Sequence, residues 1–121
     1  MSCLFNSLAP AVSLPHQIVR KAIVAFLNTN PKLYDDAKFK DVLGWMEVNS
    51  QEYLKEMSKT STWGSAVEIK AFCELFDMNV VIHPIGLGTS KQIKFECSVK
   101  NKRTAHISYN GFHYEPLYVT L

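Results

Sequence analysis

The sequence predicts a single α+β domain in which helices come first and strands later. Its 121 residues suffice for one hydrophobic core, and a content of 47% hydrophobic and 20% charged residues is typical of a globular chain. Apolar residues recur at helical spacing up to about residue 76, and segments of strand-like composition follow. No repeat, low-complexity segment or linker interrupts this order, so we expect one domain over residues 1–121.

The first part of the chain predicts helices. An apolar run that can start a helix follows Cys3 directly. A second helix is expected over residues 17–27, with a proline just before its first turn. Its apolar residues at helical spacing are Ile18, Ala22, Ala25 and Phe26. Pro31 stops this helix, because the residue before a proline is driven out of the helical region. Residues 35–45 predict a short, weaker helix.

Two further helices have recognisable N-caps. Ser50 is the predicted cap of a helix over residues 51–58, whose buried stripe is Tyr53, Leu54 and Met57. Ser65 is expected to cap a strong helix that ends near Phe76. The apolar face of that helix contains Ile69, Phe72, Cys73 and Phe76. Glu68 lies in its first turn, where a carboxylate is favourable in any protein, and we expect a structural role for it.

The last part of the chain predicts a sheet. Strands are expected over residues 79–83, 92–97, 105–109 and 112–119. Asn110-Gly111, between the last two, is the strongest short-range hairpin signal in the chain. We expect the helices to pack on a central twisted sheet made from these four strands.

Charge and cysteine content exclude several functional classes. The net charge of +2 is too small to indicate binding to nucleic acid or to an anionic membrane surface. No apolar run approaches the roughly 20 residues that span a bilayer, and no secretion signal is visible. Cys3, Cys73 and Cys97 are odd in number and form no Cys-x-x-Cys pair, which favours reduced thiols. We therefore expect a cytoplasmic monomer.

A thiol and an imidazole at opposite ends of the chain are the candidate catalytic pair. Cys3 precedes an apolar run at a helix start, and His113 follows the Asn110-Gly111 turn. A thiol becomes a strong nucleophile when a base removes its proton and its surroundings stabilise the thiolate. A helix N-terminus and a histidine from a distant strand meet both needs, which suggests a cysteine hydrolase.

Four segments resemble the ovarian tumour (OTU) family of deubiquitinating cysteine proteases. Residues 3–8 (CLFNSL) resemble its cysteine box, and residues 15–27 are similar to its first long helix. Residues 63–71 (WGSAVEIKA) resemble its Trp-Gly-Gly-x-x-Glu-Ile-x-Ala segment, and residues 113–117 (HYEPL) resemble its histidine box. The segments occur in the family's order and are spread over almost the whole chain. The resemblance implies a papain-like, OTU-like α+β fold.

The resemblance also implies a reaction and its residues. Cys3 would attack the carbonyl of the C-terminal glycine of ubiquitin or a ubiquitin-like modifier, forming a thioester, with His113 as general base and then general acid. Trp63 and Gly64 would line the channel for the modifier's tail; the alternative is a loop anchored by a buried tryptophan. No cofactor is implied.

The chain departs from the family pattern at three places. The family usually has Asp-Gly-Asn or Asp-Gly-Asp before the cysteine, where a backbone group contributes to the oxyanion hole, and here Met1 and Ser2 precede it. Glu115 stands where Asp or Asn is usual, two residues after the histidine, and shares a strand face with it. Ser65 replaces a second glycine. Glu115 is therefore the candidate that orients His113, and a water or a backbone carbonyl is the alternative.

Two other functions stay open, and a metal site is disfavoured. The chain could be an OTU-like module that binds ubiquitin without cutting it, or a viral or mobile-element protease that processes a polyprotein. A zinc site would have to use Cys73, Cys97, His83 and His106. Their spacing does not support one, so we expect no metal. His16, after a proline at a helix start, is expected to be exposed.

Overall fold

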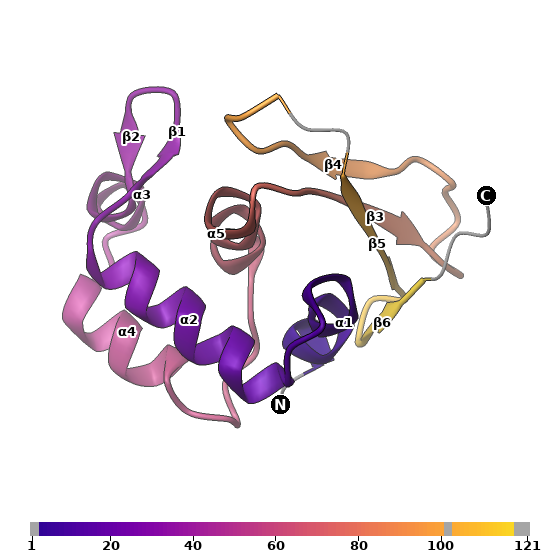
Figure 1. Cartoon of the computed structure of the whole chain (residues 1–121), viewed down its shortest axis with the longest axis horizontal. Coiled ribbons are helices and arrows are strands. Elements are labelled where there is room, and N and C mark those ends of the chain that lie inside the picture. Colours follow the sequence, from indigo (N-terminus) through magenta and orange to yellow (C-terminus); the bar gives the residue numbers. More distant parts are fainter. Residues whose placement is uncertain (1–2, 101–102, 118–121) are drawn as a thin grey trace.

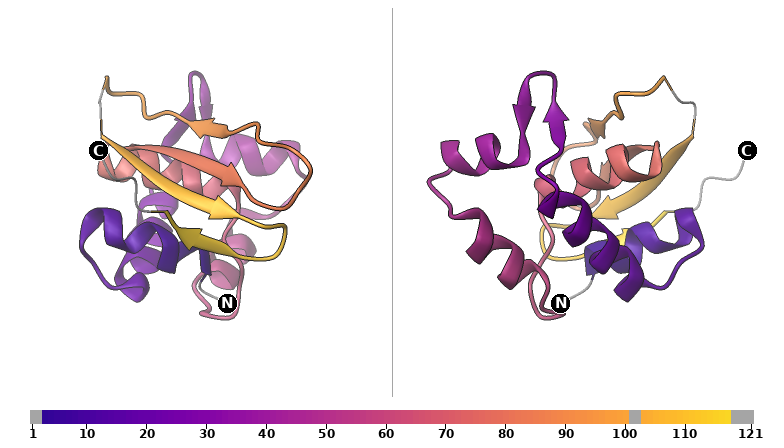
Figure 2. Two further views of the ribbon diagram at one scale, coloured as in Figure 1. Left: turned by 90° about the vertical axis from the view of Figure 1, so that its right-hand side faces the viewer. Right: turned by 60° about the vertical axis from the view of Figure 1, so that its left-hand side comes forward.

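The computed structural model describes residues 3–100 and 103–117. Its elements are, in order, α1 (Cys3–Val12), α2 (His16–Asn28), β1 (Lys32–Tyr34), β2 (Ala37–Lys38), α3 (Phe39–Trp45), α4 (Ser50–Met57), α5 (Ala66–Phe76), β3 (Asn79–Pro84), β4 (Ile93–Phe95), β5 (Thr104–Tyr109) and β6 (Tyr114–Pro116). The helices lie on one side of a small twisted sheet (Figures 1 and 2), so the predicted α+β class is confirmed. No helix within the described residues is long and apolar enough to cross a membrane.

The four predicted C-terminal strands form one sheet, in the order β4-β3-β5-β6. β3 and β5 are parallel, while β4 and β6 are antiparallel neighbours at the two edges. Val80 pairs with Ala105 and Ile82 with Ile107, and all four side chains are buried in the core. β4 and β6 are shorter than expected. Of the expected last strand, residues 118 and 119 lie outside the described part of the chain.

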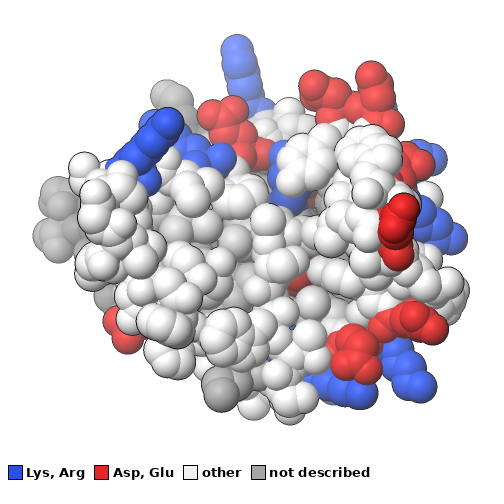
Figure 3. All heavy atoms as spheres, turned by 180° about the vertical axis from the view of Figure 1, so that it is seen from behind, with Lys and Arg blue, Asp and Glu red and all other residues white. Residues whose placement is uncertain are grey.

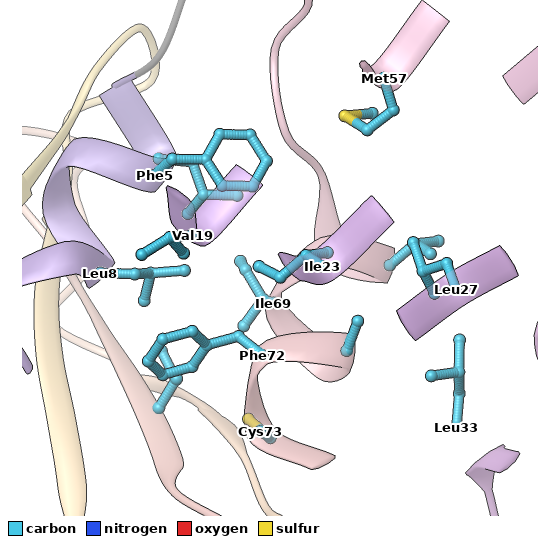
Figure 4. Packing of buried hydrophobic residues seen from close by; sticks show 14 of the residues in the cluster. Phe5, Leu8, Val19, Ile23, Leu27, Leu33, Met57, Ile69, Phe72 and Cys73 are labelled. Atoms are coloured by element: carbon cyan, nitrogen blue, oxygen red, sulfur yellow. The ribbon is translucent and has the colours of Figure 1, made fainter. Parts of the chain in front are cut away.

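α5 lies between the sheet and α2, and its start was predicted correctly (Figure 1). Ser65 is the N-cap, its Oγ accepts from the Val67 amide at 3.3 Å, and Glu68 closes a capping box. Ile69 and Phe72 of α5 point toward Phe5 and Leu8 of α1 in the core (Figure 4). This packing connects the helix that bears Cys3 to the centre of the domain.

The predicted apolar face of α2 is wrong by about one residue. The buried side chains are Val19, Arg20, Ile23 and Leu27, whereas Ile18 is 45% exposed. α2 packs against α1, α4 and α5, and these contacts orient it so that Arg20 points inward with the aliphatic residues. The spacing of apolar residues did not include Arg20 in the buried face.

Three local predictions are also corrected. Residues 35–45 do not form one helix, because β1 and β2 pair as a hairpin and α3 begins only at Phe39. The cap of α4 is Asn49 rather than Ser50: the Asn49 Oδ1 atom accepts from the amides of residues 51 and 52 at 2.9 and 3.1 Å. His16 is half-buried rather than exposed, and its Nδ1 has no hydrogen-bond partner among the described residues.

Candidate active site

Cys3 is the first residue of α1 and is half-buried. The amides of the first helical turn have no intrahelical acceptors, so they present N–H groups and the positive end of the helix dipole near the thiol. Leu4, Phe5 and Leu8 are each at most 1% exposed and hold this helix in the core. The position of the thiol is therefore fixed by the packing of the residues that follow it.

His113 ends a tightly bonded turn between β5 and β6. The Oδ1 atom of Asn110 accepts from the amides of Phe112 at 2.9 Å and His113 at 2.8 Å, and the Asn110 amide donates to the His113 carbonyl. Gly111 has a φ of +98°, a conformation that suits glycine. The hairpin is confirmed, but its turn extends to His113, so β6 begins at Tyr114 and not at residue 112.

The first helix and the last strand meet, because β6 packs against α1 (Figures 1 and 2). Tyr114, the first residue of β6, is half-buried and stacks on Tyr109 with ring centroids 4.5 Å apart. Burial raises the pKa of the Tyr114 hydroxyl, and Tyr109 and then Cys3 raise it further. Cys3 is thus close enough to act electrostatically on the residue that follows His113.

The fold brings the elements of the predicted dyad together but does not join its side chains. The His113 side chain is exposed, and no hydrogen bond connects its ring to Cys3 Sγ in the described structure. Glu115 is exposed as well and makes no hydrogen bond to that ring within the same residues. Catalytic hydrogen bonds often form only when substrate binds. The roles of these three residues stay predictions.

The Trp63-Gly64 segment lies directly beside the helix of Cys3. A Cβ atom placed on Gly64 would be 2.5 Å from Leu4 Cδ2 and 3.2 Å from Phe5 Cε2. Trp63 is 46% exposed, so the alternative of a loop anchored by a buried tryptophan is wrong. Gly64 therefore packs on the two residues that follow Cys3, and the Trp63 ring is open to solvent.

Arg20 is a residue of this region that the sequence pattern did not reveal. It is 2% exposed, its guanidinium lies 4.2 Å from the centroid of the Phe5 ring, and it donates to the carbonyls of Met57 and Thr62, both at 2.8 Å. One signal could have revealed it. In residues 19–27 the side chains of Val19, Ile23 and Leu27 share a helix face, and Arg20 lies next to that face.

The remaining cysteines and histidines include two histidines in contact and a buried cysteine. No group of three or more His, Cys, Asp or Glu side chains suited to a metal was found among the described residues. His83 Nε2 and His106 Nδ1 are 2.9 Å apart, which is a hydrogen-bond distance, and Gln92 contacts the other nitrogen of His83. Burial raises the pKa of the Cys73 thiol to about 12, as expected for an unreactive core cysteine.

Solved OTU domains share this fold over nearly the whole chain. An ovarian tumour (OTU) domain in complex with ubiquitin has a TM-score of 0.73 at 22% identity, covering 95% of this chain and 62% of that one. The viral OTU domain protease from Dera Ghazi Khan virus has 0.70 at 16% identity, covering 95% and 72%. An OTU deubiquitinase from Wolbachia pipientis wMel bound to ubiquitin has 0.68 at 17% identity, covering 97% and 89%. The predicted papain-like, OTU-like fold is confirmed.

Sequence comparison identifies the family. The chain is 26% identical over 125 residues to human ubiquitin thioesterase OTU1, and the match covers 96% of this chain but 32% of that protein. The chain therefore spans about a third of the length of this curated relative. The family described as OTU-like cysteine protease matches residues 2–117, almost the entire chain. The chain belongs to the OTU-like cysteine protease family, as the four sequence segments predicted.

Proposed function

We propose that this chain is a cysteine-dependent deubiquitinase that hydrolyses the isopeptide bond at the C-terminal glycine of ubiquitin or a ubiquitin-like modifier. The observation that carries the proposal is the contact between the first helix and the last strand: Cys3 begins α1, and the strand that follows His113 packs against that helix. Membership of the OTU-like cysteine protease family and the ubiquitin-bound structures of other OTU domains support this choice of substrate.

In the proposed reaction Cys3 is the nucleophile and His113 moves the proton. His113 takes the thiol proton, and the thiolate attacks the carbonyl carbon of the glycine. The N–H groups at the start of α1 stabilise the resulting oxyanion. The C–N bond then breaks, the proton on His113 passes to the leaving lysine amine, and a thioester remains on Cys3. Water then gives a proton to His113 and attacks the thioester carbonyl; the C–S bond breaks, the modifier leaves with a free C-terminal carboxyl group, and His113 returns its proton to the Cys3 thiolate.

Glu115 and the Trp63-Gly64 segment have supporting roles in this proposal. Glu115 is two residues from His113 and would hold its imidazole in the orientation that faces the thiol. Trp63 and Gly64 would bind the tail of the modifier, since Gly64 contacts the helix start and the Trp63 ring is accessible. Ser65 Oγ is already engaged by Glu68 at 2.7 Å, so we assign it no role in binding the tail.

A ubiquitin-binding module without catalysis is the second candidate. One observation favours it: within the described residues the Cys3 thiol and the His113 ring share no hydrogen bond. An active dyad can also lack this hydrogen bond before substrate binds. The two candidates therefore differ in chemistry with substrate bound.

A ubiquitin probe with an electrophilic C-terminus separates these candidates. We expect covalent labelling of the purified protein, lost in Cys3→Ala and retained in the control Cys97→Ser, which removes another accessible thiol. Binding without labelling would instead support the module. If the probe neither binds nor labels the protein, both candidates are excluded. The remaining alternative, a protease that processes a polyprotein, is tested by incubating the protein with a peptide that spans a polyprotein junction and measuring cleavage of the peptide.

Variants of the proposed base and its neighbour test the mechanism. His113→Ala is expected to abolish turnover while the circular-dichroism spectrum and melting temperature stay unchanged, because the side chain is exposed. Glu115→Ala should cost less, since a water or a backbone carbonyl can also orient the imidazole. Full activity of His113→Ala would refute its assignment, and a loss in Glu115→Ala as complete as in His113→Ala would make Glu115 a full triad member.

The oligomeric state and the cellular location of the chain are also proposed. A cytoplasmic monomer that binds neither nucleic acid nor membranes is supported by the three free cysteines and by the net charge of +2. On the face shown in Figure 3, charges of both signs lie around the edge and the middle is uncharged, which differs from the basic stripe of a nucleic-acid groove. Sedimentation and cell fractionation test these two points.

A further inference from the structure

Arg20 connects the helix of the proposed nucleophile to the loop before α5. Its guanidinium lies over the Phe5 ring of α1 and donates to the carbonyls of Met57 and Thr62 at 2.8 Å and of Thr60 at 3.5 Å. The planar fork of donors on arginine suits several acceptors at once, which a lysine ammonium does not reproduce. One side chain of α2 thereby fixes the segment that leads into Trp63.

Burying the charged side chain of Arg20 costs free energy that a purely apolar core would not require. Burial lowers the pKa of the guanidinium, which nevertheless stays charged, and a buried charge must be compensated by hydrogen bonds. Apolar residues of similar volume often stabilise a core as well as a buried charge does. The carbonyls that Arg20 binds belong to a segment without strand partners, so the benefit of Arg20 is the fixed course of that segment.

Glu68 holds the other end of the same loop. It is 0% exposed, its Oε1 accepts from the amide and the hydroxyl of Ser65, each at 2.7 Å, and its Oε2 accepts from the Tyr53 hydroxyl at 2.5 Å. Burial raises the pKa of this carboxyl, while its hydrogen bonds lower it. Glu68 also raises the pKa of Arg20, so the two groups interact electrostatically.

Trp63 and Gly64 lie between these anchors. Gly64 packs so closely on Leu4 that a Cβ would be 2.5 Å from its Cδ2, and Trp63 remains 46% exposed. An exposed aromatic ring whose backbone is fixed on both sides loses little entropy when it binds a ligand. A loop that is held in this way needs no rearrangement to receive a chain bound at Cys3.

We propose that Arg20 and Glu68 are positioning residues that hold Trp63-Gly64 beside Cys3 for an extended peptide tail. The inference deepens the proposed function and rests on it for the identity of the tail. Neither residue touches substrate. Both act through residues 57–65, which run from the end of α4 to the cap of α5. Removing either side chain should let Trp63 move relative to α1 while the core of the domain persists.

The movement of Trp63 can be measured without any enzymatic activity. The chain has two tryptophans, and Trp45 is 72% exposed, so Trp45→Phe leaves Trp63 as the single tryptophan at little structural cost. In that background Arg20→Lys, Arg20→Met and Glu68→Gln are expected to increase acrylamide quenching and lower the anisotropy of Trp63. Lys21→Met and Glu56→Gln are the matched controls, because both remove a charge from exposed positions on helices.

Kinetics then separate positioning from simple destabilisation. With a fluorogenic ubiquitin amide the three variants should lose on the order of tenfold or more in kcat/KM. Alkylation of Cys3 by iodoacetamide, followed by peptide mapping, should keep its wild-type rate, since the buried side chains of Leu4, Phe5 and Leu8 still hold α1 in the core when the loop loosens. Glu68→Gln is nearly isosteric, but it keeps only one acceptor oxygen and replaces the other with an NH2 donor, so it remains informative if the Arg20 variants fail to fold.

The outcomes for the loop and for the proposed function are distinct. A wild-type protein that does not cleave ubiquitin refutes the proposed function, and Trp63 quenching alone then decides on the positioning role. Wild-type quenching in all folded variants refutes the positioning role. A loss of activity that merely follows the unfolded fraction, with Cys3 alkylation accelerated in parallel, refutes it as well.

Discussion

The contact between Gly64 and α1 provides the sharpest prediction. Replacing Gly64 with alanine adds one methyl group at a position where no positive φ is required, so the backbone can accept the new residue. The added Cβ would be 2.5 Å from Leu4 Cδ2, 3.2 Å from Phe5 Cε2 and 3.3 Å from Leu4 Cβ. The effect of Gly64→Ala therefore arises from packing against the two residues that follow Cys3.

The magnitude follows from these distances. Carbon atoms in contact are usually about 3.5–4.0 Å apart, so Leu4 or the loop must shift by roughly 1 Å. Overpacking of a core costs about 1–3 kcal/mol, and the reduced freedom of the unfolded chain returns about 0.4–1 kcal/mol for a glycine-to-alanine change. We expect a net loss of about 1–2 kcal/mol in the free energy of unfolding. A displacement of Cys3 by about 1 Å would lower kcat/KM on the order of a hundredfold.

Two further variants control this prediction. Gly44 lies in α3, and a Cβ atom added to it would meet no atom within 4 Å, so Gly44→Ala should stabilise the helix by about 0.5–1 kcal/mol. Leu4→Ala removes the atom that the new methyl group meets first. In that background Gly64→Ala should cost less than in the wild type, which a double-mutant cycle measures as a favourable coupling.

Urea denaturation and cleavage of a fluorogenic ubiquitin amide are the assays. The reasoning is refuted if Gly64→Ala matches Gly44→Ala in both stability and activity. The close packing around Gly64 would then have no effect on either property. A stability loss that Leu4→Ala does not reduce would refute the identity of the clashing partner.

Two predictions concern the β5–β6 turn and the histidine pair. Asn110→Ala removes the acceptor of the Phe112 and His113 amides. It should lower the free energy of unfolding by about 1 kcal/mol and lower kcat more than it changes KM. Asn110→Asp should restore both properties, and equal activity of all three proteins would contradict the role of this turn. Burial and then His83 lower the pKa of His106 from 6.5, so stability is complete above pH 6.5 and falls as the pH drops below it. His106→Gln should flatten that decline in urea titrations, and an unchanged slope would assign it to other groups.

The parts of the fold that were predicted correctly have local causes. The Ser65-x-x-Glu68 capping box begins α5 through contacts within one helical turn, and Asn110-Gly111 starts a hairpin through the backbone preferences of those two residues. The β1–β2 hairpin has no comparable signal. Its strands have three and two residues, and the burial of Leu33 and Phe39 by distant parts of the chain stabilises it.

The candidate site shows the same division. Cys3 and His113 could be named because their immediate neighbours resemble family motifs. Their relative position depends on how β6 packs against α1, which joins residues from opposite ends of the chain and leaves no trace in either segment. Whether the imidazole reaches the thiol depends on an exposed side chain at the end of a turn, and the sequence places no constraint on its rotamer.

The misassigned face of α2 has a different cause, and it points to function. A helix that only had to fill the core would place aliphatic residues on every inward position, and the apolar pattern would then predict its face. Arg20 breaks the pattern because its hydrogen bonds go to loop carbonyls rather than to the core. Deviations of this kind are expected where a chain gives up ideal packing for a site. The failure of the helical pattern at Arg20 and the fixed loop beside Cys3 therefore have one explanation, which is that α2 supports the proposed active site as well as the core.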